Sequence, residues 1–364
     1  MNRGPIAEID LAALQKNLNI IYRAVGKRNV ISVVKADAYG HGAVTISRKL
    51  VNAGVSYLAV AFTGEAKVLR DAGITARIMV LFDNRDVMDF FTYNLIPVIY
   101  EKRTARAFAG EAAKKGLTVS VHLKIDTGMG RVGFSADTAV SDALDIAAMK
   151  GIAVEGLFSH FSDADLSDKS YAREQLELFQ RIKSDISSGL GYPLMAHMAN
   201  SAAILTLQES YLDAVRPGIM LYGCSPFEES YGLNPVMKIK SEVLAIRSLP
   251  LGSPISYGRT YVTRRKSRIA VIPVGYADGY NRLLSNNSDV LIRGKRAPVV
   301  GRICMDVTMV DVTDIRDVSE NDEVVLLGRQ MDELITAREL SDRINTIPYE
   351  IVTAFGHGAR REYV

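Results

Sequence analysis

The sequence predicts an α/β fold, a (β/α)8 TIM barrel followed by a mostly β C-terminal domain. Between about Ile31 and Gly223, short apolar runs alternate about eight times with longer helical patterns, the order of a parallel barrel. After about Pro235, the apolar runs alternate with polar residues and are separated by Gly, Asn and Asp, which is typical of antiparallel strands. A doubly wound open sheet is the alternative, and it is disfavoured because no GxGxxG follows the first strand.

The barrel strands are predicted from compact runs that are rich in apolar or β-branched residues and bounded by turn residues. The segments between the strands place apolar residues three and four apart and end on glycine, a common helix stop, so they are predicted to be helices. In chain order the predicted strands are 30–35, 57–62, 77–82, 96–100, 120–126, 153–161 and 194–201, and the clearest helices are 44–54, 64–73, 104–116 and 171–189.

The C-terminal domain is predicted to contain five strand regions, and only residues 336–344 look helical. We place the boundary within 225–236 and divide the chain into a barrel, residues 1–232, and a β-rich domain, residues 233–364. The first few residues are also candidates for packing against the second domain. The strand regions are 236–249, 268–275, 289–301, 305–313 and 322–328.

Composition excludes several classes of protein. The net charge of +3 is spread along the chain, and its densest basic stretch, 263–268, is short, which argues against a nucleic-acid partner. No segment approaches the roughly 18–20 apolar residues of a membrane helix, and the start of the chain lacks the apolar core of a signal peptide. Two cysteines are too few for a disulfide scaffold, and no CxxC or HxxxH spacing indicates a metal site. We therefore expect a cytoplasmic protein that binds neither membrane nor metal.

Lys35 closes the first barrel strand, in the segment NVISVVKADAYGHGA (residues 29–43). Barrel active sites lie at the carboxyl ends of the strands, and a lysine there is partly desolvated, which favours its neutral, nucleophilic amine. A structural lysine with a buried stem and a solvated head explains the position equally well. Position alone leaves both interpretations open.

Eight motifs in order carry a resemblance to a known family. They are VVKADAYGHG, HLKIDTGMGRVGF, EGLFSHFSDAD, HMANSAA, VRPGIMLYG, SYGRTY, PVGYADGY and VGRICMDVTMVDV. Together, over roughly Ala7 to Thr353, they resemble the alanine racemases, pyridoxal-phosphate enzymes with a barrel and a β domain. The resemblance implies that this protein interconverts L-alanine and D-alanine, and that the D-alanine is used for cell-wall peptidoglycan.

The resemblance assigns residues to the cofactor. Lys35 matches the lysine that binds pyridoxal phosphate covalently. Tyr39 matches the tyrosine that reaches its phosphate group. The backbone N–H groups of the RPGI segment are further donors, because glycine lets the chain approach closely. The phosphate group is thus expected to lie against Tyr39, Asn200, Ser201, Gly218 and Ile219.

Arg216 matches an arginine that faces the pyridine nitrogen, where many other pyridoxal enzymes place a carboxylate. Arginine cannot accept the ring proton, so the nitrogen should stay unprotonated. His197 matches the histidine that hydrogen-bonds this arginine, and His160 one beside the ring. Arg131 matches the arginine that contacts the ring oxygen of the cofactor and the substrate. Lys124 matches a lysine that is carbamylated in some members of the family.

Racemisation moves protons on both faces of the α-carbon, so a second base is needed opposite Lys35. Tyr257 matches the catalytic tyrosine, which in this family comes from the other subunit, so the resemblance implies a homodimer with shared active sites. Met305 matches the partner residue whose backbone binds the substrate carboxylate. Tyr276 and Tyr349 match the tyrosines that narrow the entrance.

The narrow entrance favours alanine, although an apolar pocket rejects the hydroxyl of serine weakly. A serine or broad-specificity racemase of the same family is therefore the first alternative. A pyridoxal-phosphate decarboxylase is disfavoured because this chain has no HxGS or EPGR segment. A non-catalytic pyridoxal-phosphate carrier is disfavoured because carriers of that kind consist of a barrel alone, without a β domain. The family's usual ending resembles SxRVPR, whereas this chain has FGHGARREYV (residues 355–364).

Overall fold

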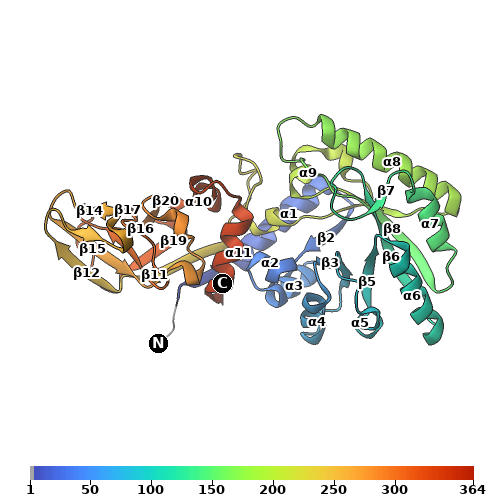
Figure 1. The fold of residues 1–364 in the computed structure, drawn as a ribbon, viewed down its shortest axis with the longest axis horizontal. Helices are drawn as coiled ribbons and strands as arrows, with labels where there is room; N and C mark the ends of the chain where they lie inside the picture. Colours follow the sequence, from blue (N-terminus) through green and yellow to red (C-terminus); the bar gives the residue numbers. More distant parts are fainter. Residues whose placement is uncertain (1–3) are drawn as a thin grey trace.

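The computed structural model describes residues 4–364, in which strand pairing closes a parallel barrel (Figure 1). Each barrel strand pairs with the next, and the last pairs with the first, β10 with β2. The eighth strand has only two residues, which is why no apolar run marks it in the sequence. The predicted (β/α)8 barrel is confirmed. Its eight strands within residues 4–364 are β2 (Asn29–Val33), β3 (Tyr57–Val60), β4 (Arg77–Val80), β5 (Leu95–Ile99), β6 (Val119–Asp126), β8 (Ile152–Phe158), β9 (Met195–His197) and β10 (Ala214–Val215).

Helices surround the barrel, and the first helix completes the ring. Helix α1 (Leu11–Val25) precedes the first barrel strand and packs against α3, α9 and η2, so it lies where the helix after the last strand would lie. Its N-terminus is capped by Asp10, whose Oδ1 accepts the N–H groups of Ala12 and Ala13 at 2.8 Å. The other elements of this part are α2 (Lys35–Tyr39), α3 (Ala43–Asn52), α4 (Thr63–Asp71), α5 (Val87–Thr92), α6 (Lys102–Lys115), β7 (Phe134–Ser135), α7 (Ala139–Ala147), α8 (Ser170–Leu190), α9 (Ser201–Thr206), η1 (Gln208–Ser210) and η2 (Ile219–Tyr222).

The rest of the chain is mostly β and extends away from the barrel (Figure 1). Its largest sheet has the order β17-β16-β19-β11-β1-β21, with β20 paired to β19. Both chain ends contribute to this sheet, because β1 (Ile6–Ile9) lies between β11 and β21. The remaining strands are β11 (Met237–Glu242), β12 (Ala245–Leu249), β13 (Pro254–Ile255), β14 (Tyr261–Val262), β15 (Ser267–Ile272), β16 (Asp289–Ile292), β17 (Lys295–Pro298), β18 (Thr308–Asp311), β19 (Glu323–Gln330), β20 (Glu333–Ile335) and β21 (Arg360–Tyr363).

The prediction of a single helical segment in this part was wrong. Besides α10 (Ala337–Arg343), the structure contains α11 (Pro348–Gly358) and the short turns η3 (Tyr257–Arg259), η4 (Tyr276–Asp278) and η5 (Arg282–Leu284). The segment of α11 reads IVTAFG, which has strand-like propensity, but Pro348 starts a helix well and burial of Ile351, Val352 and Phe355 stabilises it. Tertiary packing thus overrides local propensity here.

Most buried apolar side chains belong to one cluster that runs through both parts of the chain, so the sheet and the barrel share a packed boundary. Helix α11 lies at that boundary, between the barrel and the strands of the C-terminal part (Figure 1). Within residues 4–364, no helix is both long and apolar enough to cross a bilayer.

Candidate active site

A cavity of about 130 Å³ lies at the carboxyl ends of the barrel strands, where barrel active sites are found. It brings together residues that are far apart in the sequence but follow successive strands. Most of the residues predicted to hold a cofactor line it. The predicted residues at the cavity are Lys35, Tyr39, Lys124, Arg131, His160, Asn200, Ser201, Arg216, Gly218, Ile219 and Tyr349, and the lining also includes Val33, Leu81, Phe82 and Phe158.

Lys35 begins an unusual turn. After β2 the chain enters α2, in which Ala36, Asp37, Ala38 and Tyr39 all have φ between 50° and 54°. Left-handed backbone costs an L-residue roughly 1–2 kcal/mol, so four in succession need support from their surroundings. One support is the Glu65 carboxylate, which accepts the N–H of Ala36 at 2.5 Å. The turn directs Lys35 into the cavity, where burial and then the charge of Arg131 lower the pKa of its amine.

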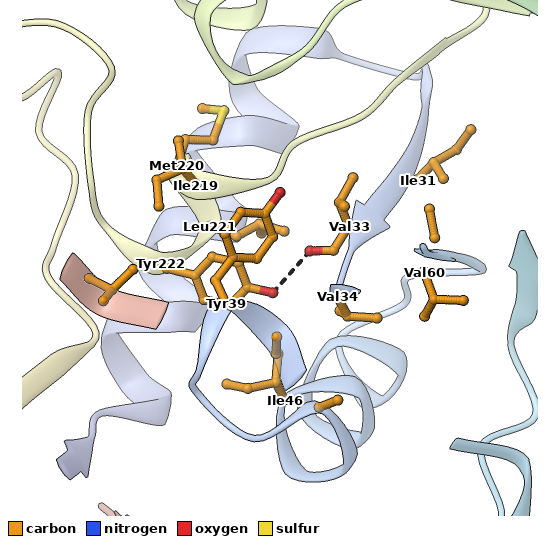
Figure 2. Packing of buried hydrophobic residues seen from close by; sticks show 14 of the residues in the cluster. Ile31, Val33, Val34, Tyr39, Ile46, Val60, Ile219, Met220, Leu221 and Tyr222 are labelled. Carbon is orange, nitrogen blue, oxygen red and sulfur yellow. Dashed lines mark hydrogen bonds between the residues drawn. The ribbon is translucent and has the colours of Figure 1, made fainter. Parts of the chain in front are cut away.

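One end of the cavity offers neutral donors. The hydroxyl of Tyr39 approaches the backbone so closely that a Cβ atom at position 218 would lie 2.5 Å from its oxygen, which explains Gly218. The Ser201 hydroxyl accepts the N–H of Gly218 at 2.9 Å. Asn200 caps α9 through the N–H of Ala203. Figure 2 shows the rings of Tyr39 and Tyr222 packed together near Ile219, with Tyr222 bonded to the carbonyl of Val33.

Arg216 also lines the cavity and is 5% exposed. Its Nη1 donates to Nδ1 and to the carbonyl of His197, at 2.7 and 2.8 Å. Its Nη2 donates to the carbonyls of Ser159 and Met198 and to Nδ1 of His160, at 2.7, 3.1 and 3.2 Å. The guanidinium is held by neutral acceptors from the ends of two strands, β8 and β9, and no carboxylate among residues 4–364 pairs with it.

His122 is a site residue that the sequence analysis missed. Since Arg216 can only donate, Nδ1 of His197 accepts, and the proton on Nε2 is donated to Nδ1 of His122 at 2.9 Å. Burial lowers the pKa of His122 to about 4 and that of His197 well below its usual range, so both rings are neutral. The spacing in the sequence could have indicated His122. It lies two residues before Lys124 in β6, so the two side chains lie on the same face of the strand.

Cations are concentrated beside the cavity. Lys124 lies over the rings of Phe82 and Phe158, at 5.5 and 5.8 Å from their centroids. Arg131 also lies over Phe82, and Arg216 over Phe158. Burial and then the charges of Arg131 and Arg216 lower the pKa of Lys124 to about 7. Burial lowers the pKa of Arg216 to about 9, which leaves it protonated at neutral pH.

The residues present fit pyridoxal phosphate. An anionic phosphate suits a cavity with several cations, and Tyr39, Ser201 and the glycine at 218 provide donors and close backbone approach at one end. The partly buried amine of Lys35 suits covalent attachment, and the fixed guanidinium of Arg216 suits the ring nitrogen.

The predicted second base does not line this cavity. Tyr257 and Met305 line a separate, open pocket of about 420 Å³ with Ser256, Cys304, Asp306 and Val307. The two residues are 69% and 52% exposed, respectively. The strand that follows Tyr257, β14, lies at the end of the C-terminal part farthest from the barrel (Figure 1).

Tyr276 lies between the two sites. It lines a groove with Tyr349, whose ring also borders the main cavity. The N–H of Tyr276 donates to the carbonyl of Cys304 at 3.0 Å, and the next N–H donates to the carbonyl of Met305 at 3.1 Å. The turn of Tyr276 therefore braces the loop of Met305, and Tyr349 is the member of this group that reaches the lysine cavity.

Comparisons with known proteins agree along the whole chain. Profiles described as alanine racemase, N-terminal domain, and alanine racemase, C-terminal domain, match residues 9–226 and 236–363. The chain is 47% identical to an alanine racemase of Thermodesulfovibrio yellowstonii, covering 100% of this chain and 99% of that one. It is 44% identical to an alanine racemase of Halothermothrix orenii, with coverage of 100% and 97%.

Solved structures are similar over the same length. The alanine racemase of a D-cycloserine-producing Streptomyces lavendulae has a TM-score of 0.94 at 34% identity, covering 100% of this chain and 98% of that one. The alanine racemase of Bartonella henselae, with covalently bound pyridoxal phosphate, has a TM-score of 0.90 at 30% identity and 100% coverage of both chains. These matches favour the racemase over the decarboxylase and the non-catalytic carrier.

Proposed function

Because this chain belongs to the alanine racemase family and is a pyridoxal-phosphate-dependent racemase of alanine, we propose that Lys35 and Tyr257 are its two bases. The observation that carries the proposal is the partly buried Lys35 amine, set at a strand end among donors for a phosphate group. Burial and Arg131 lower the pKa of this amine, which makes it a better base at neutral pH. When bound, the cofactor withdraws electrons from the α-carbon of alanine and so acidifies its proton.

Lys35 takes or returns the α-proton on one face of the substrate, and Tyr257 of the partner subunit serves the other. Tyr257 and Met305 are exposed and lie outside the cavity of their own chain, which supports a homodimer in which each subunit completes the other's site. The backbone at Met305 would bind the substrate carboxylate there. Residues 1–232 form the cofactor domain in this proposal, and 233–364 carry the second base.

The remaining cavity residues hold the cofactor. Tyr39, Asn200, Ser201 and the backbone of Gly218 and Ile219 bind its phosphate. Arg216, which is oriented by His197 and cannot take up a ring proton, would donate a hydrogen bond to the ring nitrogen of the cofactor, and His160 would lie beside the ring. Such a donor would favour an unprotonated ring nitrogen.

Arg131 is proposed to contact the ring oxygen and the substrate, and Lys124 to position Arg131. With its pKa lowered to about 7, Lys124 has a substantial uncharged fraction near neutral pH, and the neutral amine is the form that reacts with carbon dioxide. Carbamylation would replace a repelling cation beside Arg131 by an anion. Lys124 is therefore proposed to be carbamylated.

Alanine is the proposed substrate in preference to serine, with Tyr276 and Tyr349, which line one groove, proposed to narrow the entrance so that little more than a methyl side chain fits. The cytoplasm is the proposed location, and D-alanine for peptidoglycan is the proposed use of the product.

The test follows the α-proton in heavy water. Holoenzyme with L-alanine, L-serine or L-lysine should incorporate solvent deuterium with inversion only for alanine. Release of carbon dioxide, or inversion of serine as fast as alanine, would overturn the assignment. NMR of the α-position and chiral chromatography give the two readouts.

Replacing Tyr257 by Phe removes one of the two proposed bases and leaves Lys35 in place. Racemisation should fall by roughly 10²–10⁴-fold, while one enantiomer still exchanges its α-proton without inversion through Lys35. Tyr192→Phe, which alters an exposed tyrosine on the barrel, is the matched control and should keep full activity. Normal racemisation by Tyr257→Phe would show that the two-base assignment is wrong.

A further inference from the structure

We propose that Arg361 is a positioning residue that holds the left-handed turn carrying Lys35, through Asp37 and Gly40. The inference rests on the proposed role of Lys35. It gives the last strand of the chain, which belongs to the C-terminal sheet, a direct part in the geometry of the barrel's active site.

The turn needs support from both sides. Four consecutive residues without glycine, Ala36 to Tyr39, are left-handed, a conformation that L-residues rarely hold in succession. From the barrel side, Glu65 binds the N–H of Ala36, and its other oxygen accepts the N–H groups of Ala61 and Phe62 at 2.7 and 3.0 Å. Glu65 thus fixes the start of the turn but not its end.

Arg361 holds the rest of the turn from the other side. Its Nη2 forms an ion pair with Oδ2 of Asp37 at 2.6 Å, and its Nε donates to the carbonyl of Gly40 at 2.8 Å. The same Nη2 donates to the carbonyl of Gly356, in α11, at 2.7 Å. Oδ1 of Asp37 accepts the N–H of Ala43 at 2.6 Å, so the carboxylate joins the turn to the next helix. One guanidinium therefore fixes two points of the turn relative to α11.

The backbone of the turn is packed so closely against α11 that it has no room to shift. A Cβ atom at Gly40 would lie 2.8 Å from the carbonyl oxygen of Val352 and 2.9 Å from the Cα of Gly356. A Cβ at Gly42 would overlap the hydroxyl of Tyr363, in the same strand as Arg361. Because α11 touches the turn backbone to backbone and β21 touches it through the side chains of Tyr363 and Arg361, a shift of either element would move Lys35.

Helix α11 also carries Tyr349, whose ring centroid is 6.0 Å from that of Tyr39. The contacts of Arg361 with the turn and with α11 therefore fix the position of the lysine turn relative to Tyr349. Arg361 lies in the ending FGHGARREYV, where this chain departs from the usual pattern of its family, and the structure gives that segment a role in the site.

The test compares Arg361→Met with Arg360→Met. Arg360 is the neighbouring arginine of the same strand, but it pairs with Glu362 in an exposed ion pair. In the holoenzyme, Arg361→Met should lower kcat roughly tenfold with KM changed less than twofold, since small misplacements of a reacting group are costly. Amide hydrogen exchange in residues 36–42 should become several-fold faster. Arg360→Met should leave both quantities unchanged.

Two further variants keep the proposal falsifiable if Arg361→Met folds poorly. Asp37→Asn removes the ion pair while leaving the C-terminal strand intact, and it should reproduce the fall in kcat and the faster exchange. Arg361→Lys restores one charge without the second donor and should recover part of kcat. If Asp37→Asn keeps the kcat and the exchange of the wild type, or if Arg360→Met loses as much as Arg361→Met, the positioning role is wrong.

Borohydride reduction followed by peptide mapping separates this inference from the proposed function. Pyridoxal phosphate fixed on Lys35 in the wild type and in every variant, together with a slower Arg361→Met enzyme, supports both proposals. Cofactor fixed on another residue would overturn the role of Lys35. Cofactor on Lys35 with an unaffected Arg361→Met enzyme would overturn the positioning role alone.

Discussion

At the scale of single residues, the properties of Arg216 come from its neighbours. The sequence predicts an arginine at the end of a barrel strand, and a histidine that binds it. The structure adds a second histidine, His122, which accepts from His197 and so fixes the tautomer that accepts from Arg216. Nε2 of His122 is buried and has no hydrogen-bond partner among the described residues. Such an arrangement favours neutral rings, since a second proton on either ring would create a buried positive charge close to that of Arg216.

Neutral, buried His122 makes stability depend on pH. An unfolded histidine takes up a proton near pH 6.5, but the pKa of folded His122 is lowered to about 4, so the unfolded state binds more protons between these values. The free energy of unfolding should therefore fall as pH is lowered from about 6.5 to about 4, by on the order of 3 kcal/mol for this group. Thermal unfolding midpoints from pH 7 to pH 4 measure the effect.

The matched variant is His122→Gln, whose amide oxygen can still accept from His197. It should be less stable than the wild type at pH 7 but lose less stability on acidification. His41, whose pKa burial also lowers to about 4, remains in the variant and keeps part of the slope. Identical slopes for the two proteins would contradict the assignment of this proton uptake to His122.

At the scale of elements, the turn after β2 is the feature that local sequence does not predict. KADAY has ordinary helical propensity, and alanine is the best helix former, yet Ala36 to Ala38 have φ near +50° and ψ near +50°. The handedness is imposed by Glu65 on one side and by the contacts of Arg361 on the other. Similarly, the strand-like sequence of α11 forms a helix because its apolar face is buried.

The strain in this turn can be measured by glycine substitution. Ala36 is exposed, so Ala36→Gly removes little packing but relieves roughly 1–2 kcal/mol of left-handed strain. The more flexible unfolded chain offsets about 0.4–1 kcal/mol of this gain. The variant should be as stable as the wild type or slightly more stable.

Ala113→Gly, at an exposed position in the right-handed helix α6, is the control and should lose roughly 0.5–1 kcal/mol. Thermal unfolding of the two holoenzyme variants against the wild type makes the comparison. Equal destabilisation by both substitutions would mean that the turn stores no strain.

At the scale of the whole molecule, the proposed site is divided between two distant surfaces of one chain. Lys35 lies in the barrel cavity, whereas Tyr257 and Met305 lie exposed in the C-terminal part. The continuous core across the boundary and the Gly40–Gly356 contact fix the two parts of the chain relative to each other. A second copy of the chain is therefore the proposed source of the second base at each cavity.

Subunit mixing tests this arrangement. Lys35→Ala and Tyr257→Phe should each be nearly inactive as homodimers. If they are unfolded and refolded together with cofactor, mixed dimers contain one intact site, and activity should return to about one quarter of the wild-type value for random pairing. The same variants refolded separately and then mixed serve as the control. No recovery, with mixed dimers shown by mass, would contradict the shared site.

The sequence by itself determined the (β/α)8 barrel with its mostly β C-terminal part, the position of Lys35 at a strand end and, through its motifs, the family. It could do so because periodicity and motifs are local, and because barrel strands all end at one face. Only the tertiary structure decided the left-handed turn, the helical state of α11 and the histidine tautomers set by His122. It also decided the contact of Arg361, in the last strand, with the turn after β2. These depend on contacts between residues far apart in the chain, such as Asp37 with Arg361, and burial and hydrogen bonding at such contacts outweigh local propensity.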